Sequence, residues 1–172
     1  MSIEEELQEN SEHAHNAFDK KVAASMAVIA AGLAVVSVLG HFSTTEEILA
    51  QQKASDEWAY YQAKSIRRYE SGFVADILSA VKSPDAAQKY KGNVAKYDNE
   101  SKEISEKATE FERERDLRHR QALRLDVGEV FLEIAIVLAS LAILAKRAFL
   151  WWGALASGLA GAAIAITTIW LR

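Results

Sequence analysis

The sequence contains no cysteine, only one proline and only eight glycines among its 172 residues. Without cysteine there is no disulfide framework, no thiolate metal ligand and no cysteine nucleophile. Because so few residues interrupt helices, the composition predicts long helices joined by few turns. The motifs of serine hydrolases, P-loop proteins, zinc metalloproteases and dinucleotide-binding folds are also missing. We therefore expect no enzymatic activity, no catalytic residues, no metal site and no cofactor.

Charge is also missing from long parts of the chain. Residues 22–40 and 127–171 carry few charges, and most acidic and basic residues lie in 1–21 and 43–126. A soluble domain would mix apolar and charged residues more evenly. The net charge is −4, and the basic cluster at 113–124 is interleaved with acidic residues, so we expect no nucleic-acid partner.

The longest apolar region, Val127–Arg172, consists of two runs joined by Lys146 and Arg147. Each run is long enough to cross a bilayer, which takes about 20 helical residues. A third stretch, Val22–Gly40, lacks the polar stripe that a soluble helix would show. We therefore predict three transmembrane helices, at about residues 22–40, 129–145 and 148–170.

Two patterns predict helix starts between the first and second spans. Ser43–Glu46 has capping-box spacing, which predicts a new helix after a break at 40–42. Ser83-Pro84-Asp85 predicts another start, followed by a helix that continues directly into the second span. The expected fold is an all-α membrane protein with three transmembrane helices and a long extramembrane antiparallel, coiled-coil-like helical hairpin. Its segments are a polar N-terminal segment (1–21), transmembrane helix 1 (22–41), the hairpin (42–126), and transmembrane helices 2 (127–146) and 3 (147–172).

Both arms of this hairpin show apolar residues at steps of three and four, as coiled coils do. In the second arm the predicted seam is Tyr90, Val94, Tyr97, Ile104 and Phe111. In the first arm it is Ala59, Ala63, Ile66, Phe73, Ile77 and Ala80, with an aromatic cluster beside it at Trp58, Tyr60 and Tyr61. Since a two-helix hairpin buries little surface alone, we expect these residues to pack between the arms or against other subunits.

The second span contains a candidate intramembrane polar site made of Asp126, Glu129 and Glu133, which share one helical face. One interpretation places Asp126 and Glu129 at the headgroup boundary, with only Glu133 inside the bilayer. The other makes Glu133 a ring around the axis of an oligomer, as in cation-selective constrictions. In both, Glu133 is expected to face a helix interface or a central axis, and not lipid.

Small residues in the third span recur every four positions in two neighbouring rows and predict tight helix packing: Gly153, Ser157, Gly161 and Ala165 in one row, and Ala154, Gly158 and Ala162 in the other. In the N-terminal segment, His13 and His15 are expected to be surface residues, because a metal site needs further ligands.

Four features together resemble the domain-of-unknown-function-4337 family of bacterial membrane proteins. They are EHAH at 12–15, a lone first span, WAYYQAKSI at 58–66 and FLEIAIVLASLAIL at 131–144. The resemblance covers nearly the whole chain. It implies a multi-pass protein of the bacterial inner membrane with this helical layout, and it implies no activity.

Two functions remain open from the sequence. The first is an oligomeric membrane scaffold or interaction protein without catalytic activity, whose partners are membrane lipids and its own copies. The alternative is a small ion- or proton-conducting channel with Glu133 facing the axis. Basic residues near the spans (Lys20, Lys21, Lys146 and Arg147) share one side and predict that this side is cytoplasmic and the hairpin periplasmic. The basic cluster at 113–124 argues for the opposite orientation.

Overall fold

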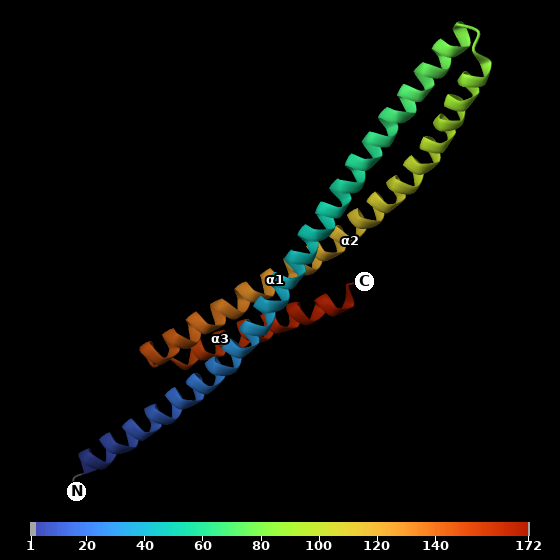
Figure 1. The fold of residues 1–172 in the computed structure, drawn as a ribbon. Coiled ribbons are helices and arrows are strands. Elements are labelled where there is room, and N and C mark those ends of the chain that lie inside the picture. Colours follow the sequence, from blue (N-terminus) through green and yellow to red (C-terminus); the bar gives the residue numbers. More distant parts are fainter. Residues whose placement is uncertain (1–2, 172) are drawn as a thin grey trace. The chain divides into compact units, whose positions relative to one another are not determined.

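The computed structural model describes the backbone of residues 3–171 and the side chains of residues 17–171. It consists of helices α1 (Ile3–Ala80), α2 (Pro84–Ala145) and α3 (Ala148–Thr167), followed by the short 3₁₀ helix η1 (Thr168–Trp170) (Figure 1). The part of the chain that is described contains no strand, so the predicted all-helical class is confirmed. The expectations for His13 and His15 concern side chains that lie outside the described residues.

Helix α1 runs through residues 40–46 without interruption, so the predicted break and new helix start there were wrong. Gly40 and Ser43 are buried, and a Cβ atom on Gly40 would lie 3.6 Å from Oδ1 of Asp126 on α2. The helix therefore packs closely at the position where a break was expected. A serine or threonine can cap a new helix or continue an existing one, and here packing favours continuation.

The two turns between the α-helices have the same construction. Lys82 and Lys146 adopt the left-handed conformation, with φ of 58° and 53°. The amide of Ser83 donates to the Leu78 carbonyl at 2.9 Å, and the amide of Arg147 donates to the Ala142 carbonyl at 3.3 Å. These are Schellman motifs, which satisfy the last carbonyls of a helix. As predicted from the proline, α2 begins at Pro84. It continues unbroken to Ala145, through the second predicted span.

The chain forms two compact units. Unit 1 comprises residues 1–44 and 119–172, and unit 2 comprises residues 45–118. In unit 1, parts of α1 and α2 pack with α3 around two apolar clusters. The first is Val22, Ala139, Ala142 and Ala154, and the second is Val36, Leu125 and Leu132.

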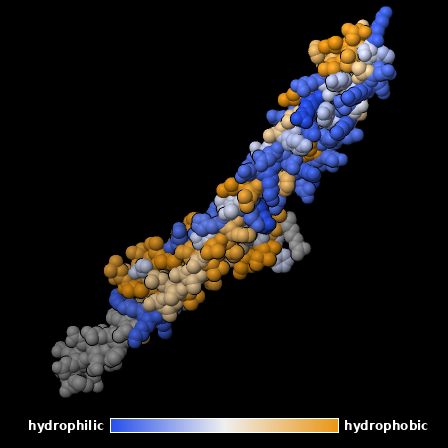
Figure 2. Space-filling view, in the orientation of Figure 1, coloured by the Kyte–Doolittle hydropathy of each residue, from blue (hydrophilic) through white to orange (hydrophobic). Residues whose placement is uncertain are grey.

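Unit 1 also exposes large apolar side chains, and the face of it seen in Figure 2 is largely apolar. Val28, Leu144 and Ile169 are 72, 81 and 77 % exposed. Each of the three α-helices contains a stretch long and apolar enough to cross a membrane. The sequence-based prediction of three such helices is therefore confirmed.

In unit 2, α1 and α2 pair in opposite directions. Gln51 contacts Arg115, and further along α1 Arg68 contacts Asp98, so rising residue numbers in α1 meet falling numbers in α2. The contact is lined largely by small buried side chains: Ala50, Ala54, Ser71 and Ala75 on α1, and Ala87, Ser101, Ile104 and Ala108 on α2. These side chains let the helices approach closely.

The predicted first-arm seam does not pack against α2. All six of its residues are exposed, including Ile66 at 57 % and Phe73 at 68 %. Of the two predicted packing partners, the second arm is therefore excluded for this face, and packing against other subunits stays a prediction. Helix α2 instead covers a neighbouring face of α1, where Trp58 and Tyr61 are half-buried, while Tyr60 points to the exposed side.

Candidate functional site

The three acids of the second span lie on α2 in unit 1. Asp126 and Glu133 are exposed and Glu129 is half-buried. Asp126 lies against Gly40, and the hydroxyl of Ser140 contacts Sδ of Met26 at 3.6 Å. Because Glu133 is midway between Asp126 and Ser140, two helical turns from each, it lies on the same flank of α2, beside α1.

Glu133 forms no hydrogen bond or ion pair with any residue of the described part of the chain. Its exposed neighbours Val130, Ile134 and Val137 are apolar. A single carboxylate in such surroundings can bind a cation only when water or another chain supplies further ligands. Within residues 17–171, no three histidine, cysteine, aspartate or glutamate side chains are grouped closely enough to bind a metal.

The small residues of α3 lie against α2. Gly158 and Gly161 are buried, while Gly153 and Ser157 are half-buried. The hydroxyl of Ser157 donates to the Phe131 carbonyl at 2.7 Å. These residues shape the contacts of α3 with α2 and, at Gly158, with Ile29 of α1, and none of them forms a reactive group.

Two polar contacts in unit 1 were missed from the sequence. The indole nitrogen of Trp151 donates to Oγ of Ser25 at 3.0 Å, and Lys146 forms an ion pair with Asp19. Both join the start of the first apolar stretch to the turn between α2 and α3. A basic residue and a tryptophan at a span end are typical interfacial residues, but their partners could not be identified from spacing.

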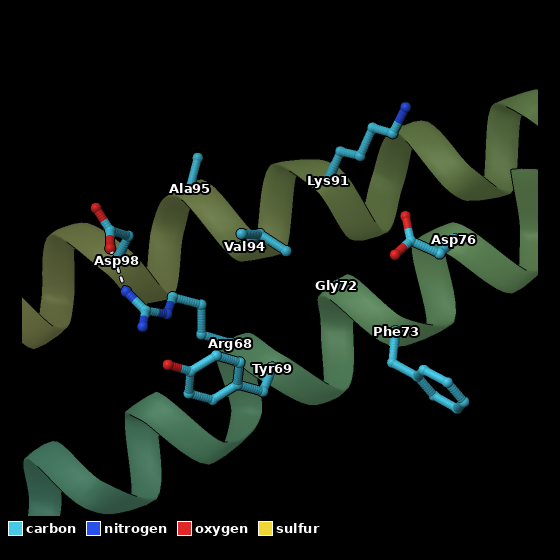
Figure 3. Close-up of a pocket in the computed structure, with 9 residues that line it drawn as sticks. All are labelled: Arg68, Tyr69, Gly72, Phe73, Asp76, Lys91, Val94, Ala95 and Asp98. Carbon is cyan, nitrogen blue, oxygen red and sulfur yellow. Dashed lines mark hydrogen bonds and ion pairs between the residues drawn. The ribbon is translucent and has the colours of Figure 1, made fainter.

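Unit 2 contains a shallow groove of about 590 Å³ between α1 and α2 (Figure 3). Gly72 widens it, because an added Cβ atom there would lie 3.9 Å from Val94. In Figure 3 the ring of Phe73 points away from α2, and Asp76 points toward it. The groove is lined by Arg68, Tyr69, Gly72, Phe73 and Asp76 of α1 and by Lys91, Val94, Ala95 and Asp98 of α2.

Ion pairs hold the carboxylates near this groove in their charged form. Asp98 accepts from Arg68 at 2.5 Å and pairs with Lys102 at 2.9 Å. The hydrogen bond from Lys102, followed by that from Arg68, lowers the pKa of Asp98 below its ordinary value. Two residues further along α2, the hydrogen bond from Lys64 at 2.6 Å likewise lowers the pKa of Glu100. Carboxylates that stay ionised in ion pairs, with lowered pKa values, are poor general acids and bases.

The second-arm seam faces α1. Ile104 is buried, and Tyr90, Val94, Tyr97 and Phe111 are half-buried. Lysines of α1 cover two of these rings: Nζ of Lys53 lies 5.4 Å from the Phe111 centroid, and Nζ of Lys64 lies 5.6 Å from that of Tyr97. The aromatic residues therefore meet charged side chains of α1, which the apolar spacing did not reveal.

The family described as "Domain of unknown function (DUF4337)" matches residues 18–171. No curated protein and no solved structure matches the chain. The family match includes α2, α3 and all but the first turns of α1, and it contains both the acids of α2 and the groove of unit 2. The chain therefore belongs to the DUF4337 family.

Proposed function

We propose that this protein is a non-enzymatic scaffold of the bacterial inner membrane, which spans the bilayer three times and associates with its own copies. The observation that carries the proposal is the exposed apolar surface of unit 1. It extends over all three spans and includes Val35, Val137 and Leu159, each more than half exposed. In water this surface would drive aggregation, whereas acyl chains cover it at no cost.

Unit 2 supports an extramembrane role for the helical hairpin. Its arms are joined by ion pairs such as Lys64–Glu100 and Arg118–Glu46, at 2.6 and 2.8 Å. Ionised pairs of this kind are stable in water and costly inside a bilayer. A charged pair of helices outside the membrane presents a long surface for protein contacts, and the groove between them is shallow and open.

Membrane fractionation tests the first part of the proposal. The protein is expected to stay with membranes after an alkaline carbonate wash and to be released by detergent. Native mass spectrometry in detergent is then expected to show more than one copy per particle. Release by carbonate alone would contradict membrane insertion, and a single-copy mass would contradict self-association.

Orientation can be measured with single cysteines because the chain has none of its own. Ser83→Cys lies in the turn of unit 2, and Arg147→Cys lies in the turn between α2 and α3. We expect an impermeant maleimide to label Ser83→Cys in intact spheroplasts and to label Arg147→Cys only after lysis. The reverse pattern would place the hairpin in the cytoplasm.

A channel is the second candidate, supported by the unpartnered Glu133 on α2. Several copies that share this carboxylate around an axis would provide the missing ligands for a cation or proton. Ion flux into liposomes should then be abolished by Glu133→Gln and unchanged by Glu103→Gln, which alters an exposed acid of unit 2. Absence of flux through the wild-type protein would leave the scaffold and exclude the channel.

A further inference from the structure

One end of unit 1 carries an excess of positive charge at the edge of the apolar surface. The charged residues that the structure describes at this end are Asp19, Lys20 and Lys21 of α1, and Lys146 and Arg147 in the turn between α2 and α3. Four cations and one carboxylate leave three positive charges in excess. Figure 2 shows hydrophilic residues that border the apolar surface here.

Two contacts hold this part of α1 against the turn. Lys146 forms an ion pair with Asp19, and the indole nitrogen of Trp151 donates to Oγ of Ser25 at 3.0 Å. Trp151 belongs to the first turn of α3. Lys21 precedes Ser25 by one helical turn, so it lies on the same flank of α1, beside the start of α3. The lysines of α1 and the turn therefore belong to one surface.

Three of the four cations are not neutralised by a described side chain. One pairs with Asp19, whereas Lys20, Lys21 and Arg147 are exposed and form no hydrogen bond or ion pair with any side chain of residues 17–171. We name Lys20, Lys21 and Arg147 the basic rim. Along α1 the next acid beyond the rim is Glu12, which is about 12 Å of helix from Lys20. The basic rim is therefore open to an anion from outside the chain.

Large apolar side chains adjoin the basic rim on the side of the spans. Leu144, Phe149 and Trp152 lie close to Arg147 in the chain and are 81, 68 and 63 % exposed. A ligand that fits both surfaces has an anionic head and apolar chains. An anionic phospholipid has this chemistry, because its phosphate accepts charge-assisted hydrogen bonds from lysine and arginine while its acyl chains cover apolar side chains. A soluble anion would leave those side chains in water.

We infer that the basic rim binds the phosphate of an anionic phospholipid, which gives the protein a preference for such lipids over zwitterionic ones. This inference rests on the proposed membrane insertion and assigns a lipid class to one end of the spans. The opposite end of unit 1 has no comparable excess, since Arg120 and Arg124 are matched there by Asp126 and Glu129. Arg124 also donates to the Thr167 carbonyl at 3.4 Å.

Native mass spectrometry of the full-length protein in detergent tests the preference. The protein is mixed with equal amounts of phosphatidylglycerol and phosphatidylcholine that have the same acyl chains, and the retained lipids are counted. We expect the wild type to retain phosphatidylglycerol at least about tenfold more often, because each lysine or arginine near an anionic lipid strengthens the attraction about fivefold. The preference should decrease as salt is added. Equal retention of the two lipids would overturn the inference.

Charge removal assigns the preference to the basic rim. The triple variant Lys20→Gln, Lys21→Gln and Arg147→Gln should retain the two lipids almost equally. Its helicity should be unchanged, because all three side chains are exposed. An unchanged preference in this variant would overturn the inference. The control removes two lysines and one arginine from exposed positions of unit 2 and should keep the wild-type preference: Lys89→Gln, Lys107→Gln and Arg113→Gln.

Two further measurements separate this inference from other outcomes. Excess glycerol phosphate, which has the phosphate but no acyl chains, should not displace the bound lipid, and displacement would overturn the assignment to a lipid. Release of the wild type from membranes by carbonate would refute insertion, and with it the proposed function. A carbonate-resistant protein that retains both lipids equally would refute only the role of the basic rim.

Discussion

Gly128 of α2 and Gly161 of α3 lie so close that a Cβ atom on Gly161 would be 2.7 Å from the Gly128 carbonyl oxygen. The same atom would lie 3.0 Å from side-chain atoms of Phe131 and Leu132. Backbone oxygen cannot move aside as a flexible side chain can. The close packing of α2 against α3 therefore depends on the absence of a side chain at Gly161.

Gly161→Ala is expected to destabilise the α2–α3 contact by about 1 to 3 kcal/mol, the usual cost of overpacking. The measurement is the apparent melting temperature of the detergent-solubilised protein, followed by size-exclusion chromatography. Gly32→Ala is the matched control, because a Cβ atom on Gly32 would have nothing within 4 Å. Equal melting temperatures for the two variants would refute the close crossing.

Ile104→Asp is expected to separate the arms of unit 2. Ile104 is 6 % exposed between the helices, and an aspartate there would be a buried charge without a partner. Such a group costs several kcal/mol. Loss of helical signal at low urea, followed by circular dichroism, is the expected readout. Ser101→Ala is the control, since Ser101 is also buried and its hydroxyl has no described partner. It should retain or raise stability.

Acid is expected to weaken the pairing of the arms. The pKa values of Asp98 and Glu100 in the folded chain lie below their ordinary values of 3.8 and 4.5, owing first to hydrogen bonds from Lys102 and Lys64. A carboxyl with a lowered folded pKa stabilises the fold above its ordinary pKa and loses that contribution as the pH falls through the folded value. The urea midpoint of unit 2 should therefore fall as the pH drops below about 4.5. Asp98→Asn combined with Glu100→Gln should reduce this dependence, and an unchanged slope would contradict it.

Lys82→Gly is expected to stabilise the turn between α1 and α2. Lys82 has a φ of 58°, which costs a side-chain-bearing residue about 1 kcal/mol and costs glycine little. Lys146→Gly relieves the same conformation but removes the ion pair with Asp19, so its gain should be smaller. Melting temperatures of both variants provide the comparison, and a loss of stability in Lys82→Gly would contradict the turn assignment.

The apolar helices and the start of α2 were predictable from the sequence, whereas the continuity of α1 through residues 40–46 and one packing face were not. Long uncharged runs predicted the apolar helices, because hydropathy is a property of each segment alone. Pro84 predicted the turn before α2, because proline fixes its own φ and suits the first position of a helix. The face of α1 that packs on α2 could not be identified from the sequence, because spacing gives weight to large residues such as Phe73. Helix α2 packs instead on Ala54 and Ser71, whose small side chains permit close approach but carry little signal.

The candidate site was predictable only in part, for a related reason. The acids of α2 could be placed on one face from their spacing, since helical geometry determines it. Contacts between distant segments, such as Trp58 with Glu112 at 2.9 Å, depend on how the helices pair. No periodicity within one segment reveals that pairing, and the charged surroundings of the groove were missed for this reason.

The paired arms of unit 2 restrict how their length can change. Contacts from Gln51–Arg115 to Arg68–Asp98 keep one register, and the turn at Lys82 and Ser83 has no slack to absorb a shift. An insertion in one arm alone would misalign every pair beyond it, and an insertion other than seven residues would rotate the inner face outward. Natural length variants of unit 2 are therefore expected to gain or lose residues in both arms together, in steps of seven, or about 10 Å of helix.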